Sequence, residues 1–114
     1  MVEGNSNLGS LENRQEREHW QPLFSLGLEL FTRGTEETIQ KARQGIDELL
    51  YRHTVGDWGD LPEIDRERNY RALEHGWEIV SAYTLPTGVT IWICTSANRT
   101  QTTVTDKEIP HFNE

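Results

Sequence analysis

The hydrophobic pattern changes its period before the final third of the chain. From Ile39 to Leu73, apolar side chains recur at helical spacing. Residues 77–85 and 89–95 alternate apolar and polar side chains instead, and residues 101–105 are rich in β-branched Thr and Val. Helical patterns followed by strand patterns predict an α+β fold.

The three C-terminal segments are the best defined part of the predicted sheet. Turn residues separate them, so they predict a three-stranded antiparallel β-meander. Residues 23–31 also alternate, which predicts an N-terminal strand with Leu28 and Leu30 on its buried side. We expect this strand to join one edge of the meander or to pair with the segment before it.

Two or three helices are predicted between the N-terminal strand and the meander. One helical pattern covers residues 35–51, with Thr35 as its cap, and Gly45 is expected to break it. A second pattern runs from about residue 61 to 75, where Asp60 and Glu63 resemble a capping box. We expect the helices to pack on one face of the sheet.

The composition limits the chain to one domain with a small core. It has 114 residues, of which 34% are hydrophobic. Hydrophobic residues are scarce at both ends, so we expect a disordered N-terminal tail at 1–18, a single α+β domain at 19–105 and a C-terminal tail at 106–114.

Cysteine usage and targeting signals point to one compartment. Cys94 is the single cysteine, which excludes an internal disulfide and fits a reducing environment. We find neither a secretory signal pattern nor an apolar run long enough to span a bilayer. The sequence therefore predicts a cytoplasmic protein without membrane contact.

The net charge of −8 argues against nucleic-acid binding through a basic face. An acidic surface instead favours a protein partner with a basic surface. Four tryptophans in a chain with a small core favour an apolar surface patch, and with it a homodimer.

One connection between the helical patterns stands out because it contains a tryptophan. It reads Gly56-Asp57-Trp58-Gly59-Asp60-Leu61. Trp58 is either a core plug between helix and sheet or an exposed anchor for a partner. Asp57 and Asp60 either stabilise the glycine turn and cap the next helix, or are paired carboxylates for metal binding or acid–base chemistry. We take Asp57, Trp58 and Asp60 as the candidate partner-binding residues.

The order of these motifs resembles a family of small, uncharacterised bacterial proteins carried on plasmids and other mobile elements, often called plasmid-related proteins. The resemblance covers roughly residues 19–105. It rests on these runs and positions, in chain order: His19-Trp20-Gln21-Pro22-Leu23-Phe24-Ser25-Leu26-Gly27, Arg52-His53, Gly56-Asp57-Trp58-Gly59-Asp60-Leu61, Ser81-Ala82-Tyr83, Gly88, Ile91-Trp92-Ile93 and Thr102-Thr103-Val104. It implies a compact cytoplasmic domain and a mobile-element setting. It implies no activity and no catalytic residue.

Few residues suggest catalysis. The four histidines have no metal-binding spacing, and there is no glycine-rich phosphate loop, nucleophile elbow or dinucleotide fingerprint, so no metal and no cofactor are expected. The alternative is a small metal-independent ribonuclease or toxin-like enzyme, with His53 moving protons, Arg99 stabilising the phosphorane and Thr102 positioning the phosphate.

The first hypothesis is a small acidic binding protein without enzymatic activity. It would be of mobile-element origin and would modulate a host or element-encoded protein. One version is inhibition of a host defence or nucleic-acid-processing protein. The ribonuclease hypothesis stays open beside it, because His53 is either a general acid–base or a helix C-terminal histidine.

Overall fold

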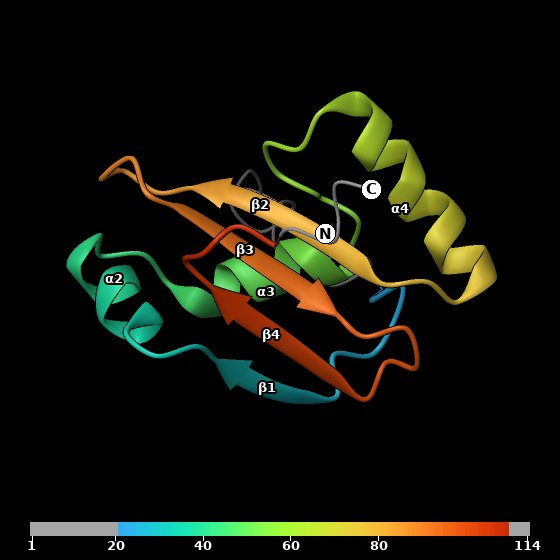
Figure 1. Ribbon diagram of the computed structural model, residues 1–114, viewed down its shortest axis with the longest axis horizontal. Helices are drawn as coiled ribbons and strands as arrows, with labels where there is room; N and C mark the ends of the chain where they lie inside the picture. The colour runs from blue at the N-terminus through green and yellow to red at the C-terminus, as the bar shows by residue number, and fades with distance from the viewer. Residues whose placement is uncertain (1–20, 110–114) are drawn as a thin grey trace, which may run out of the picture.

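The computed structural model describes residues 21–109, which form three helices and one four-stranded mixed sheet (Figure 1). The elements follow in the order β1 (Leu28–Phe31), α2 (Thr35–Lys41), α3 (Ile46–Thr54), α4 (Glu63–His75), β2 (Ile79–Thr84), β3 (Thr90–Thr95) and β4 (Gln101–Thr105). The predicted α+β fold is confirmed. The N-terminal tail predicted at 1–18 lies outside the described residues, as do His19 and Trp20.

The strand order in the sheet is β1-β4-β3-β2. The pairs β2–β3 and β3–β4 are antiparallel, so the predicted meander is confirmed. β1 pairs with β4 in parallel, which places the N-terminal strand at one edge of the meander and β2 at the other. Such a parallel pair needs a long crossover, which here consists of all three helices and the two strands of the meander before β4.

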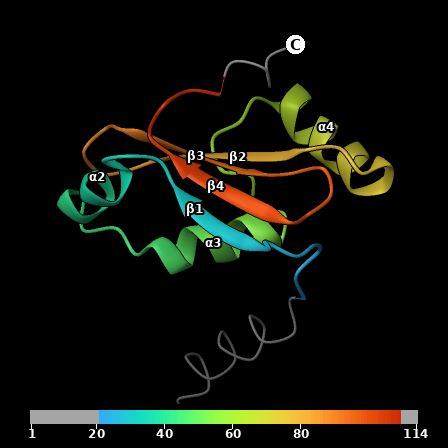
Figure 2. The ribbon, with the colours of Figure 1, turned by 60° about the horizontal axis from the view of Figure 1, so that its bottom comes forward.

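Two helices cover one face of the sheet, and the third lies beside its β2 edge. α2 and α3 pack against the side chains that point to one face, and α3 lies below the sheet in Figure 2. α4 flanks the β2 edge, where the Asn69 side chain donates to the Val80 carbonyl at 2.7 Å and accepts from the Val80 amide at 3.2 Å. The expectation that the helices pack on one face of the sheet holds for α2 and α3, whereas α4 packs against the β2 edge.

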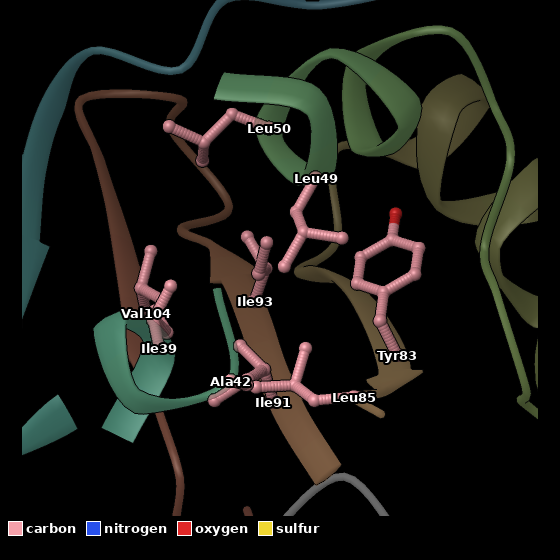
Figure 3. Packing of buried hydrophobic residues seen from close by; sticks show 9 residues of the cluster. All are labelled: Ile39, Ala42, Leu49, Leu50, Tyr83, Leu85, Ile91, Ile93 and Val104. Atoms are coloured by element: carbon pink, nitrogen blue, oxygen red, sulfur yellow. The ribbon is translucent and has the colours of Figure 1, made fainter. Parts of the chain in front are cut away.

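The first hydrophobic cluster fills the space between the sheet and the helices α2 and α3 (Figure 3). Alternate residues of the strands meet one stripe of each helix there, as the two periodicities require. Its buried members are Ile39, Ala42, Leu49, Leu50, Tyr83, Leu85, Ile91, Ile93 and Val104.

The second cluster lies between α4, the loop at 55–62 and β2. Its buried members are Trp58, Leu61, Ala72, Ile79, Val80, Ala82 and Ile109. Ile109 is 8% exposed, so the packed part of the chain reaches beyond residue 105, where we had expected the C-terminal tail to begin. No helix within 21–109 has the length and apolarity needed to cross a membrane.

The N-terminal strand is shorter than predicted and presents the other face. Leu28 is 64% and Leu30 is 37% exposed, whereas Phe31 packs against the first cluster. The strand begins only after Gly27, whose φ is +64° and whose missing side chain lets its backbone approach that of Thr100. The parallel register then pairs Phe31 with Val104 and leaves the leucines on the far side.

The helix starts also differ from the expected caps. The break at Gly45 is confirmed, since α2 ends at Lys41 and α3 begins at Ile46. Thr35 is the first residue of α2, and its hydroxyl donates to Asp106 at 3.3 Å. Asp60 does not cap α4, which begins at Glu63 without a side-chain cap, so the predicted capping box is wrong.

Candidate functional site

The loop at 55–62 closes the β2 edge of the sheet. The Asp60 amide donates to the Ala82 carbonyl at 2.7 Å, and the Ala82 amide donates to the Trp58 carbonyl at 3.2 Å. The Thr84 amide donates to Oδ2 of Asp60 at 2.8 Å. These bonds occupy backbone groups that an edge strand otherwise exposes.

Trp58 is the hydrophobic plug of this loop. Its side chain is 2% exposed and packs against Phe24, His53 and Tyr70, with ring centroids 5.8–6.5 Å away. Its Nε1 has no hydrogen-bond partner among the described residues. Trp58 as an exposed anchor for a partner is therefore wrong, because the ring lies within the second cluster.

Asp57 stabilises the glycine turn, which was one of the two roles predicted for it. Its carboxylate accepts from Nε of Arg52 at 2.7 Å and from the Gly59 amide at 3.2 Å. Burial raises the pKa of Asp57, but the hydrogen bonds from Arg52 and Gly59 outweigh this effect and hold the pKa below its usual range. The carboxylates of Asp57 and Asp60 both serve this fold; whether they also contact a partner stays a prediction.

His53 belongs to a buried chain of polar groups. Its Nδ1 lies 2.6 Å from the Ser81 hydroxyl, and its Nε2 lies 2.9 Å from the Thr95 hydroxyl. Thr95 is 2.7 Å from the Thr102 hydroxyl, which donates to the Leu26 carbonyl at 2.7 Å. The chain ties α3 to β2, β3, β4 and the segment before β1.

The environment of His53 keeps the imidazole neutral. The side chain is fully buried, and burial, with a smaller contribution from the charge of Arg99, lowers its pKa to about 3. A general acid–base needs contact with its substrate and a pKa near the working pH. His53 has neither in this structure, since both ring nitrogens are held by hydroxyls inside the core.

Arg99 organises the backbone near the end of α4. Its Nη1 donates to the carbonyls of Trp77, Ser96 and Ala97 at 2.7–3.1 Å, and its Nη2 donates to the Ala72 carbonyl at 3.1 Å. These four bonds direct the guanidinium toward main-chain oxygens. The structure thus links His53 to Thr102 inside the core but gives Arg99 a different task, so the three residues form no solvent-facing catalytic site.

The other chemical groups give no site either. Among residues 21–109, no three His, Cys, Asp or Glu side chains are grouped so that they could hold a metal ion. Cys94 is partly buried, and burial raises the pKa of its thiol to about 12, so the thiol is protonated at neutral pH.

The largest concavity of the described chain lies between residues 22–29 and α3. It is an open cleft of about 760 Å³. Phe24, Leu26 and Leu50 contribute apolar surface, while Glu29 and Asp47 contribute two carboxylates. No Lys or Arg is among the described residues that line it: Pro22, Phe24, Ser25, Leu26, Gly27, Glu29, Asp47, Leu50, Tyr51 and Thr54.

Sequence reasoning missed this cleft. Its walls come from two segments with different periodicities, and no motif connects them. The available signal was the acidic Glu29 within an alternating apolar segment, together with Asp47 in the first turn of the next helical pattern. Comparisons with protein-family models, curated proteins and solved structures found no match for this chain.

Proposed function

We propose that this protein is a non-enzymatic binding protein whose acidic cleft, formed by residues 22–29 and α3, receives a basic segment of a partner protein. The observation that carries the proposal is the placement of Glu29 and Asp47 in the largest concavity without a basic residue among its described lining. Carboxylates in a partly apolar cleft attract cationic side chains and hold their aliphatic stems.

The polar groups that suggested an enzyme support the proposal indirectly. His53 is fully buried with hydroxyls on both ring nitrogens, and Arg99 donates to four carbonyls. Both residues stabilise the fold through these contacts. A ribonuclease built on His53, Arg99 and Thr102 would need the core to open before His53 or Thr102 could reach a phosphate.

The wider setting of the proposal comes from the sequence. The resemblance to plasmid-related proteins supports a mobile-element origin and a cytoplasmic partner, such as a host defence or nucleic-acid-processing protein. Proteins that bind nucleic acid carry basic surfaces, and the net charge of −8 would speed association with them.

The experiment compares two double variants of equal charge. The tagged protein is expressed in its native host, and co-purifying proteins are identified by mass spectrometry at moderate salt. Glu29→Lys with Asp47→Lys reverses the cleft, whereas Glu67→Lys with Glu74→Lys reverses two exposed acids of α4. We expect the cleft variant to lose a stoichiometric partner that the α4 variant retains. Equal retention or equal loss, with both variants folded, would contradict the proposal.

A further inference from the structure

We infer that the partner segment binds as an extended strand that adds to β1, with basic side chains directed into the acidic cleft. This inference rests on the proposed function and specifies its mode of binding. It starts from the backbone of β1, which forms the edge of the sheet beside the cleft.

The hydrogen bonds of β1 define which of its groups face outward. The Leu28 amide donates to the Thr100 carbonyl at 2.9 Å, and the Thr32 amide donates to the Val104 carbonyl at 3.0 Å. Amides alternate in direction along a strand, so those of Glu29 and Phe31 point away from β4. They form a short row of donors that can pair with another extended chain.

This edge of the sheet is less protected than the opposite edge. The residues Leu28, Glu29, Leu30 and Phe31 contain no proline and no lysine, and no described segment pairs with their outer side. Natural proteins block exposed edges with such residues, with a covering loop, with other charged side chains or by keeping the strand short. β1 has the last two, because it is four residues long and carries Glu29. The opposite edge has that covering loop at 55–62, which makes the open β1 edge a distinct feature of this fold.

The side chains beside this edge specify the chemistry of the incoming strand. Glu29 points to the face that carries α3, where Asp47 faces the same cleft. Leu28 and Leu30 point to the opposite face and are exposed. A strand beside β1 would place alternate residues on these two faces, so a segment that alternates basic and apolar residues matches both.

A second copy of this chain matches the edge poorly. Pairing β1 with itself would bring Glu29 and Asp47 of one protomer toward the same carboxylates of the other. Like charges on neighbouring strands are destabilising, so the charge of the cleft favours a basic partner over a homodimer.

The test uses the full chain and a defined probe, a capped octapeptide of alternating Arg and Val carrying a fluorophore. The matched control peptide alternates Glu and Val. Affinity is measured by fluorescence anisotropy at low salt, and the site is mapped by amide chemical shifts. We expect the Arg-Val probe to shift the amides of Glu29, Leu30, Phe31 and Asp47, and the Glu-Val peptide to leave them unchanged.

Two substitutions at one position separate charge from backbone pairing. Glu29→Gln removes the carboxylate and keeps the outward amide; Glu29→Pro removes both, and edge strands tolerate proline at such positions. We expect Glu29→Gln to lower the affinity for the Arg-Val peptide by about twofold to fivefold, as for the loss of an exposed ion pair. Glu29→Pro should lower that affinity by about a further tenfold, because the outward amide of residue 29 that would donate to the peptide is lost.

The outcomes distinguish the inference from the function on which it rests. If the probe shifts Asp47 and Tyr51 but Glu29→Pro binds as well as Glu29→Gln, the cleft binds basic segments and strand addition is wrong. If no cleft amide shifts, both are wrong. If Glu29→Pro unfolds, amide hydrogen exchange is measured on the unaltered protein instead. Strand addition then requires that saturating Arg-Val peptide slows exchange of the Glu29 and Phe31 amides. Sedimentation at high concentration must show a monomer, since a dimer broken by Glu29→Pro would identify a second copy as the occupant.

Discussion

The two edges of the sheet are treated in opposite ways. At β2, the loop at 55–62 donates to and accepts from the strand backbone and seals the contact with the buried Trp58. At β1, the outer amides have no partner among the described residues, two leucines are exposed, and an acidic cleft lies beside the strand. The same sheet thus has one edge covered by a loop and one edge with which no described segment pairs.

The comparison shows that a distinctive motif can have a structural role. The Gly-Asp-Trp-Gly-Asp block is the most specific run of the sequence, yet its residues serve to close an edge. Gly59 approaches the Ala82 carbonyl too closely for a side chain, and Asp60 accepts from the Thr84 amide. The cleft beside β1 has no comparable motif, because its function would depend on shape and charge.

Replacing Trp58 with Ala should have the largest effect on the closed edge. We expect the free energy of unfolding to fall by about 3–5 kcal/mol, because the substitution opens a cavity in the second cluster. Urea denaturation measures the change. Trp77→Ala is the control, since Trp77 is 40% exposed, and it should cost much less. Equal losses would show that Trp58 is not the plug of this edge.

Gly59→Ala should cost about 2–5 kcal/mol of unfolding free energy. Its φ is +75°, and a Cβ would overlap the Ala82 carbonyl and approach Cδ1 of Tyr83 to 2.6 Å. Gly88→Ala is the matched control, because Gly88 has a φ of +94° but open space around it. A thermal shift no larger than that of Gly88→Ala would mean that the loop does not hold its place on β2.

Acid should lower the free energy of unfolding, because His53 is buried as a neutral imidazole beside the closed edge. The folded-state pKa is about 3 and the unfolded value is 6.5, so the unfolded state binds more protons between these values. The stability is therefore fully present above pH 6.5 and falls by about 1.4 kcal/mol for each pH unit below it. Denaturation curves from pH 7 to 4.5 measure the slope, which should vanish in His53→Gln. A flat profile in the unaltered protein would contradict the buried, neutral imidazole.

Substitutions at the open β1 edge should change the free energy of unfolding least. Leu28→Ser is expected to change the unfolding free energy by less than about 0.5 kcal/mol, because Leu28 is 64% exposed. Ile93→Val, which removes one methyl group from a fully buried side chain, should cost about 0.5–1.5 kcal/mol in the same urea assay. A larger cost for Leu28→Ser would show that another part of the chain packs on this edge.

Much of the fold could be predicted because local patterns define it. The alternation in 77–95 and the turn at Gly88 specify the meander, and Gly45 marks the helix break. The orientation of β1 could not be predicted, because its partner β4 lies more than 70 residues away and decides which leucines face the core. Local periodicity gives the alternation of a strand but does not say which side is buried.

The candidate site was less predictable for a related reason. His53 was considered either a catalyst or a helix-terminal residue, but its ring binds hydroxyls of β2 and β3 that only the tertiary fold brings near. Arg99 likewise finds carbonyls of α4 and of its own turn. Asp47 and Glu29 meet in the cleft through the same long-range packing, and no spacing along the chain predicts it.

Hydrogen exchange of individual backbone amides tests the contrast between the two edges most directly. In the free protein, we predict slow exchange at Ala82 and Thr84, whose amides donate to the loop, and fast exchange at Glu29 and Phe31, which point away from β4. If the amides of Glu29 and Phe31 exchange as slowly as that of Ala82, the β1 edge is covered. That result would contradict the proposal, because no edge would be left for a partner strand.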